Sequence, residues 1–394
     1  MNYYAAYSAE RSPMTQETII PITDSAALTQ LCRKLAHEAF ITVDTEFMRE
    51  RTYYPQLCLV QVAGETDAAV IDALAPGLDW TPFWELMQNR DVLKIFHAPR
   101  QDIEIFVKMS GAVPAPVFDT QIAAMACGFP DQTSYARLSE ALTGTVIDKQ
   151  EQFTDWTARP LRPAQLIYAL QDVTILRKVY EALQKKLSAA DRHEWLAEDM
   201  DQLNDINYYR VNPDDAWERL KLRSNRPASW AALKSLAAWR EREAMRLDRP
   251  RQMILKDDVL TQLAMSVPNT QEALVKTRGI PNNIANNPEV LAMLVAAKQA
   301  KNDAIPKRTD APSLTPSQED QMELLKMALK IIARQQNVSP KLIAHNEDLN
   351  EFLLNGENPV LSTGWRKDIF GRIAGELLQG AIGMKIKEGR LILE

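Results

Sequence analysis

The chain lacks the features that mark secreted, membrane-spanning or strongly basic proteins. Only three cysteines occur among its 394 residues, and no two have the spacing of metal ligands. We expect Cys32, Cys58 and Cys127 to be reduced, buried thiols. Residues 1–17 are polar, without the apolar core of a secretory signal, and no run reaches the ~18 apolar residues that span a membrane. These absences predict a soluble cytoplasmic protein with a disordered N-terminal extension, residues 1–17.

Glycine is also scarce, and acidic residues outnumber basic ones. There are 13 glycines, whereas leucine, alanine and glutamine are abundant, which favours a helix-rich protein. The net charge is -6, which argues against a histone-like binder of nucleic acid but leaves room for a local basic groove around an acidic centre. The length allows two or three domains.

Strands and helices alternate between residues 19 and 190, which predicts an α/β domain. Short apolar runs indicate strands at 40–47, 57–62, 68–71 and 92–96, with a weaker candidate at 19–22. Helical spacing and capping residues indicate helices at 26–39, 80–89, 99–110, 119–127, 137–142 and 162–189.

The remainder of the chain shows helical patterns and no convincing strand. We expect the α/β domain at 18–208, followed by two all-α bundles at 209–303 and 304–394. The two bundles share a pattern in which a proline ends a long helix, a short apolar run follows, and an acidic pair begins the next helix. The pattern occurs at Pro250 with Asp257-Asp258 and at Pro340 with Glu347-Asp348, which suggests two copies of one unit.

The strand at 40–47 ends in two carboxylates. Asp44 and Glu46 are two residues apart, so their side chains should point to the same side of the strand. Carboxylates held that close repel each other unless a proton or a cation lies between them, and Mg²⁺ and Mn²⁺ prefer carboxylate oxygens. A D-x-E pair alone is more often two solvated acids at a strand end, so it needs support from the rest of the chain.

Further acids begin or line the predicted helices. Tyr168 and Asp172 are four residues apart and share one helix face. Asp102 lies in the first turn of its helix, where an acid is commonly only a partner of the helix dipole. Asp119 starts a helix and is expected to be a cap rather than a ligand.

Taken together, these residues resemble the DEDD exonucleases of the tyrosine subclass. V-D-T-E-F at 43–47, H-A-P-R-Q-D at 97–102 and Y-x-x-x-D at 168–172 match the three motifs in order. The residues flanking the motifs are similar to the ribonuclease D branch, and the helical bundles are similar to its helicase-and-RNase-D C-terminal (HRDC) domains. The second bundle departs further from the HRDC pattern than the first. The resemblance implies a ribonuclease H-like α/β exonuclease domain followed by two HRDC-type bundles.

The family also implies a mechanism and its residues. Asp44, Glu46, Asp102 and Asp172 would hold two divalent ions, Mg²⁺ or Mn²⁺, and Tyr168 would orient the attacking water. By this resemblance, Asp44 would bind both ions. Glu46 and Asp172 would bind the ion on the side of the attacking water, and Asp102 would bind the other ion.

Five residues near the motifs are candidates for binding the RNA 3′ end. Phe47 and Tyr53, with Tyr54, follow the first motif, where aromatic rings stack on bases in other nucleases, although packing under the sheet is an equal alternative for Phe47. Gln61 and His97 are within reach of sugar or phosphate, or are structural hydrogen-bond partners. Basic runs at 219–226, 239–249 and 364–372 are candidates for gripping RNA or for solvated helix faces.

The expected function is 3′–5′ exoribonuclease action that releases 5′-mononucleotides and trims tRNA precursors and other structured RNAs with a single-stranded 3′ end. The enzyme is expected to be a monomer without an obligate protein partner or a membrane. A DNA-directed exonuclease of the same chemistry, a catalytically silent RNA-binding scaffold and a non-nuclease helical adaptor remain as alternatives. Digestion of matched RNA and DNA oligomers would test for the DNA-directed exonuclease, and a metal titration would test for the catalytically silent scaffold.

Overall fold

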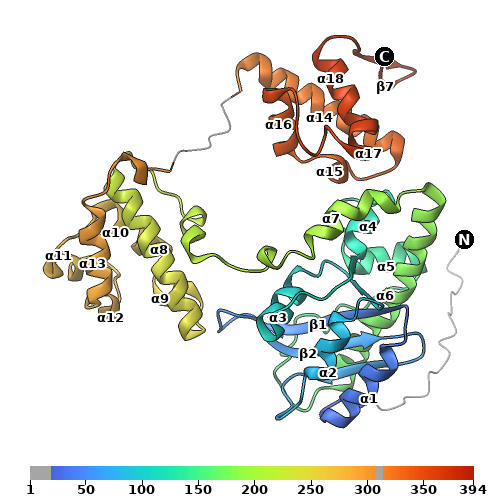
Figure 1. Cartoon of the computed structure of the whole chain (residues 1–394), viewed down its shortest axis with the longest axis horizontal. Helices are drawn as coiled ribbons and strands as arrows, with labels where there is room; N and C mark the ends of the chain where they lie inside the picture. Colours follow the sequence, from blue (N-terminus) through green and yellow to red (C-terminus); the bar gives the residue numbers. More distant parts are fainter. Residues whose placement is uncertain (1–18, 307–313) are drawn as a thin grey trace, which may run out of the picture.

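A twisted five-stranded sheet forms the centre of the N-terminal part of the chain in this computed structural model, which describes residues 19–306 and 314–394 (Figure 1). The predicted extension at residues 1–17 lies outside the described residues. The strand order is β3-β2-β1-β4-β5, with β1–β2 and β2–β3 antiparallel and β1–β4 and β4–β5 parallel. The strands are β1 (Phe40–Met48), β2 (Gln56–Ala63), β3 (Ala68–Asp72), β4 (Leu93–Phe96) and β5 (Val117–Asp119).

Helices cover both faces of this sheet. One face packs against α1 (Ser25–Leu35), α2 (Thr81–Gln88) and α3 (Arg100–Ser110). The other packs against α4 (Thr120–Ala126), α5 (Tyr135–Thr143) and the 28-residue α6 (Pro163–Ala190). Buried aliphatic and aromatic side chains dominate both faces of the sheet, and the strands also bury a few polar side chains, among them Thr42, Gln61 and Lys94.

The predicted strands at 40–47, 57–62, 68–71 and 92–96 and the predicted helices of this domain are confirmed, with small differences at their ends, but the three-residue strand β5 was not predicted. The candidate strand at 19–22 forms only one bridge, between Ile22 and Ile71. The predicted helix at 26–39 ends earlier because the backbone turns after Leu35 and the Ala36 amide closes the last turn on the Cys32 carbonyl. Asp119 caps α4 by accepting a hydrogen bond from the Gln121 amide, as expected.

Two helical units follow the α/β domain. The connecting segment contains η1 (His193–Leu196), α7 (Ala197–Gln202) and η2 (Ile206–Tyr208). The first helical unit comprises η3 (Pro213–Arg219), α8 (Pro227–Leu247), α9 (Arg251–Ile254), α10 (Asp257–Ser266), α11 (Gln271–Val275), α12 (Asn282–Ala285), α13 (Pro288–Ala297) and η4 (Asn302–Ala304). The second comprises α14 (Pro316–Gln336), α15 (Pro340–Ile343), α16 (Asn346–Asn355), α17 (Gly364–Arg366), η5 (Lys367–Gly371) and α18 (Arg372–Leu378).

The second unit is not purely helical, which corrects the all-α expectation. β6 (Met384–Lys387) and β7 (Arg390–Leu393) pair as an antiparallel hairpin. The two residues between them, Glu388 and Gly389, both have positive φ, which suits a tight two-residue hairpin turn. The hairpin packs partly on the core of this unit through Met384 and Leu393.

The first three α-helices of each unit correspond in length and order. α8, α9 and α10 have 21, 4 and 10 residues, and α14, α15 and α16 have the same three lengths. Each long helix ends at a left-handed residue, Asp248 in one and Asn337 in the other. The shared pattern at Pro250 and Pro340 therefore corresponds to a shared structure. None of the helices in residues 19–306 and 314–394 is long and apolar enough to cross a membrane.

Candidate active site

The end of β1 and two helices on opposite faces of the sheet bring four acids together. Asp44 and Glu46 lie on the face that α6 crosses, since Thr42 on that face donates its hydroxyl to the Val173 carbonyl at 2.8 Å. Asp172 lies on α6, one turn after Tyr168. From the other side, α3 supplies Asp102 in its first turn.

Asp102 reaches the site because β1 extends beyond its pairing with β4. That pairing covers only residues 40–42 of β1 because β4 ends at Phe96, so β1 continues without this partner where the acids begin. Thr45 donates its hydroxyl to Asp102 Oδ1 across this gap. The hydrogen bond holds the carboxylate, which is 8 % exposed, against the end of β1.

The four carboxylates influence one another electrostatically. Burial, and then the charges of Asp102, Asp172 and Glu46, hold the pKa of Asp44 well above its usual range. The same causes, burial first and then Asp172 and Asp102, raise the pKa of Glu46 to about 9. Burial raises the pKa of Asp102 to about 6 and that of Asp172 to about 7. Negative charge in this confined space is unfavourable without a compensating cation.

The donor set fits hard divalent cations, which prefer carboxylate oxygens. Asp172 is 5 % exposed, and its Oδ1 atom has no hydrogen-bond partner. Within the described ranges, no group of three or more His, Cys, Asp or Glu side chains is spaced to coordinate an ion as it stands. Carboxylates that repel each other are expected to close around an ion only when one is present.

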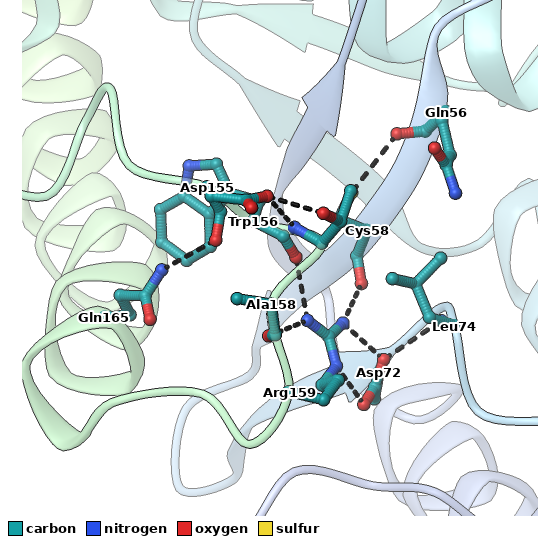
Figure 2. A network of polar contacts seen from close by, with 10 residues as sticks. Gln56, Cys58, Asp72, Leu74, Asp155, Trp156, Ala158, Arg159 and Gln165 are labelled. Carbon is teal, nitrogen blue, oxygen red and sulfur yellow. Dashed lines mark hydrogen bonds and ion pairs between the residues drawn. The ribbon is translucent and has the colours of Figure 1, made fainter.

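A polar network holds the loop that packs against Tyr168 (Figure 2). The Trp156 ring lies 6.2 Å from the Tyr168 ring, centroid to centroid, and is 2 % exposed. Arg159 binds both carboxylate oxygens of Asp72, at 2.6 and 2.7 Å. It also donates to three backbone carbonyls, those of Cys58, Trp156 and Ala158. The guanidinium thereby fixes the loop carrying Trp156 to the edge of β2 and β3.

Gln61 and His97 lie near the acids and retain free polar atoms. Gln61 stands opposite Asp44 in the β1–β2 pairing, and neither amide atom of its buried side chain has a partner. His97 accepts or donates one hydrogen bond with the Thr120 hydroxyl through Nδ1, at 3.0 Å, and its buried Nε2 has none. Burial lowers the pKa of His97 to about 4, so the ring is neutral near pH 7.

The two aromatic candidates are differently placed. Phe47 is half-buried and packs against the core under α3. Tyr53 is 7 % exposed and lies in the core of the first helical unit, where its hydroxyl donates to Glu241 in α8 at 2.5 Å. This placement corrects the expectation that Tyr53 stacks on a terminal base, because the helical unit already covers its ring.

Two arginines of the basic runs are buried in internal ion pairs. Arg366, from the run at 364–372, is buried and pairs with Glu198 and Asp199 of the connecting segment. Arg240 is buried and binds Asp257 at 2.6 Å. These side chains join parts of the protein instead of facing solvent.

Sequence reasoning did not single out Tyr135, Trp156 or Arg159. The Tyr135 hydroxyl donates to the Asp172 backbone carbonyl at 2.6 Å, which fixes α6 beside α5 at the site. The Asp155-Trp156 pair, an aromatic inside a polar loop, was the available signal for Trp156. No local sequence pattern indicates the roles of Tyr135 and Arg159, because their partners Asp172 and Asp72 lie 37 and 87 residues away in the sequence.

Comparison with known proteins gives a consistent result. Residues 19–188 match the 3′–5′ exonuclease family, and residues 230–287 match the HRDC domain family. The chain is 46% identical over 385 residues to a ribonuclease D from Acidiphilium cryptum, covering 96% of this chain and 98% of that protein. It is 44% identical over 381 residues to a ribonuclease D from Granulibacter bethesdensis, covering 93% and 95%.

Solved structures agree with these matches. The crystal structure of Escherichia coli RNase D, described as an exoribonuclease involved in structured RNA processing, superposes with a TM-score of 0.75 at 30% identity. The match covers 92% of this chain and 99% of that one. The similarity therefore extends over the exonuclease domain and the helical region together.

Proposed function

The chain belongs to the ribonuclease D family of 3′–5′ exoribonucleases, and we propose that it removes 5′-mononucleotides from the 3′ ends of tRNA precursors and other structured RNAs. The observation that carries the proposal is the convergence of Asp44, Glu46, Asp102 and Asp172 at the end of β1, where Asp102 and Asp172 are 8 % and 5 % exposed and their charges act on Asp44 and Glu46. Such an arrangement is unfavourable for a purely structural site, because burial raises the pKa of all four carboxylates and neighbouring charges raise those of Asp44 and Glu46 further.

Exonucleases of this type generally use divalent metals, and the proposed cofactors are two Mg²⁺ or Mn²⁺ ions held by these four carboxylates. When bound, such ions supply positive charge to the attacking and leaving oxygens of a phosphodiester displacement. The free Oδ1 of Asp172 and the high pKa values of the uncompensated carboxylates support this assignment.

Tyr168 is proposed to orient the attacking water. Burial, and then the charge of Asp172, raise the pKa of Tyr168 above its ordinary value, so the phenol keeps its proton and acts through a hydrogen bond. Trp156 packs beside this ring, and Arg159 fixes the loop that carries Trp156. The protein thereby presets the direction of the hydroxyl before RNA arrives.

The single-stranded 3′ end is proposed to contact Gln61, His97 and Phe47. The free amide of Gln61 beside Asp44 and the free Nε2 of His97 are the observations that support polar contacts. We further propose an exonuclease domain at 18–208, an HRDC domain at 209–303 and an HRDC-like domain at 304–394, in a monomeric cytoplasmic enzyme. The matches at 19–188 and 230–287 support the first two.

The test is digestion of 3′-labelled and 5′-labelled tRNA precursors by the full chain and by Asp44→Asn. The parent should shorten RNA from its 3′ end and release 5′-mononucleotides, and it should act faster on RNA than on DNA of matched sequence. Asp44→Asn should lose essentially all turnover and should bind Mn²⁺ more weakly in calorimetry. Wild-type cleavage by Asp44→Asn would refute the site, and equal rates on DNA would refute the RNA preference.

A further inference from the structure

A cleft of about 920 Å³ lies between the α/β domain and the first helical unit. One wall contains Ala98 and Gln101, which directly precedes Asp102 of the active site. The opposite wall contains Arg219 of η3 and Arg251 of α9. The cleft therefore runs from α3, the helix that carries Asp102, along the first helical unit, and none of the four acids is among its lining residues.

Arginine dominates the charged side chains of this cleft. Five arginines line it, namely Arg49, Arg100, Arg210, Arg219 and Arg251, against three acids, Glu104, Asp215 and Glu218. The whole chain has a net charge of -6, so this excess of positive charge is local. A basic groove beside an acidic centre is the pattern expected for guiding a polyanion to metal-binding carboxylates.

Some of these arginines are held in ion pairs within the protein, and others are exposed without an acidic partner among the described residues. Arg219 and Arg251 lie 3.8 and 3.2 Å from the buried Glu241 carboxylate, and Arg49 pairs with Glu104 at 3.0 Å.

Arg100 and Arg210 are exposed, and neither has an acidic partner among the residues that the structure describes. Arg100 stacks over the Tyr208 ring at 4.9 Å, which orients its guanidinium while leaving the N–H edge free.

The loop between β1 and β2 holds the two walls in place. Its Tyr53 and Tyr54 amides both donate to Asp248 at the end of α8, at 3.1 and 3.0 Å. Lys108 of α3 lies 3.9 Å from the centre of the Tyr54 ring. Figure 1 shows this loop reaching from the sheet toward α9. The width of the cleft is therefore set by contacts formed within the protein.

We propose that this cleft binds the phosphate backbone of single-stranded RNA immediately 5′ to the nucleotide in the active site, with Arg100 and Arg210 as its phosphate contacts. Guanidinium groups suit this role because their N–H pairs match two phosphate oxygens. The inference rests on the proposed exoribonuclease function and adds to it the path of the strand. It also assigns the exonuclease domain and the first helical unit a joint substrate surface.

The test compares binding of a ten-nucleotide single-stranded RNA and a dinucleotide in the cleavage-deficient Asp44→Asn background. In that background, Arg100→Gln with Arg210→Gln should weaken binding of the ten-nucleotide RNA. The slope of the logarithm of the association constant against log[salt] is negative, and its magnitude should become smaller by about 1.4, since each of the two phosphate contacts on a single strand contributes ~0.7. Arg33→Gln, an exposed arginine on α1 far along the chain from the cleft residues, is the matched control and should keep the parental slope.

In the active protein, the double variant should lose more kcat/KM on the ten-nucleotide RNA than on the dinucleotide. Thermal unfolding midpoints equal to the parent would show that both exposed substitutions leave the fold intact. If the parent digests RNA from the 3′ end but the double variant has the parental salt slope, the cleft assignment is wrong and the proposed function stands. If the parent does not digest RNA at all, the proposed function itself fails.

Discussion

Replacing Arg159 by methionine should destabilise the exonuclease domain and slow catalysis, although Arg159 touches none of the four acids. The substitution keeps much of the aliphatic side chain but removes two charged contacts to Asp72 and three to backbone carbonyls. The Asp72 side chain is only 11 % exposed and would lose its counter-ion. Figure 2 shows that these contacts all converge on one guanidinium.

The expected cost follows from that burial. Removing one partner of a fully buried ion pair costs about 3–5 kcal/mol. Arg159 is 26 % exposed, so solvent screens part of this loss. We expect about 2–3 kcal/mol, which lowers the urea midpoint by about 0.7–3 M for slopes of ~1–3 kcal/mol/M. kcat should fall because Trp156 no longer holds the Tyr168 ring, whereas Mn²⁺ binding should remain.

Arg162→Met provides the control, because Arg162 lies in the same loop, its side chain is 57 % exposed, and it pairs with Glu151, which is 15 % exposed, without binding backbone carbonyls as Arg159 does. Solvent screening at the arginine limits the contribution of such a pair to about 1 kcal/mol. Urea unfolding and single-turnover RNA cleavage are measured for the parent and both variants. Equal midpoints for Arg159→Met and Arg162→Met would refute the assigned role of the network.

Other substitutions and conditions test the site directly. Tyr168→Phe should retain Mn²⁺ binding in calorimetry but lose about 10²–10⁴-fold in single-turnover rate, the size typical of a positioned proton-transfer group. Tyr53→Phe should leave the Glu241 carboxylate with one hydrogen bond fewer and lower the free energy of unfolding by about 1–3 kcal/mol, with little change in rate on a dinucleotide. Without divalent ions, the folded state binds extra protons, because Asp102, Asp172 and Glu46 have pKa values of about 6, 7 and 9. Stability in EDTA should therefore fall as pH rises from 5 to 9, and Mn²⁺ should restore more of it at pH 8 than at pH 6, as measured by urea unfolding.

Most strands and helices of the exonuclease domain were predictable because each has a local signal, whereas the three residues of β5 are too few to give one. Asp44 and Glu46 end a continuous apolar run, and Asp102 follows a strand and Pro99 at a helix start. The hairpin at 384–393 was missed because each strand has only four residues, and its one local signal is the Glu388-Gly389 turn.

The roles of several surrounding residues could not be predicted, because a distant partner decides them. Tyr53 belongs to the interface only because Glu241 lies 188 residues further along the chain. Arg366 lies in a basic run, yet Glu198 and Asp199 remove it from the RNA-binding candidates. Local sequence therefore identifies the acids more readily than the residues that position them.

Each helical unit contacts the exonuclease domain through the turn that ends its long helix, which is α8 in the first unit and α14 in the second. The two turns contact different parts of that domain. In the first unit, Asp248 at the end of α8 accepts hydrogen bonds from the Tyr53 and Tyr54 amides. In the second, the carbonyl of Asn337 at the end of α14 accepts one from Arg192, and the Ser339 amide donates to the Met125 carbonyl at 2.9 Å.

A left-handed residue at each turn ends the helix and exposes backbone and side-chain oxygens that a neighbouring domain can bind. The proline that follows each turn prevents the long helix from continuing, so it preserves this binding edge. The repeated proline pattern in the sequence thus marks the attachment points of both units. Because the first turn borders the arginine-lined cleft, its attachment also sets the proposed path of the RNA.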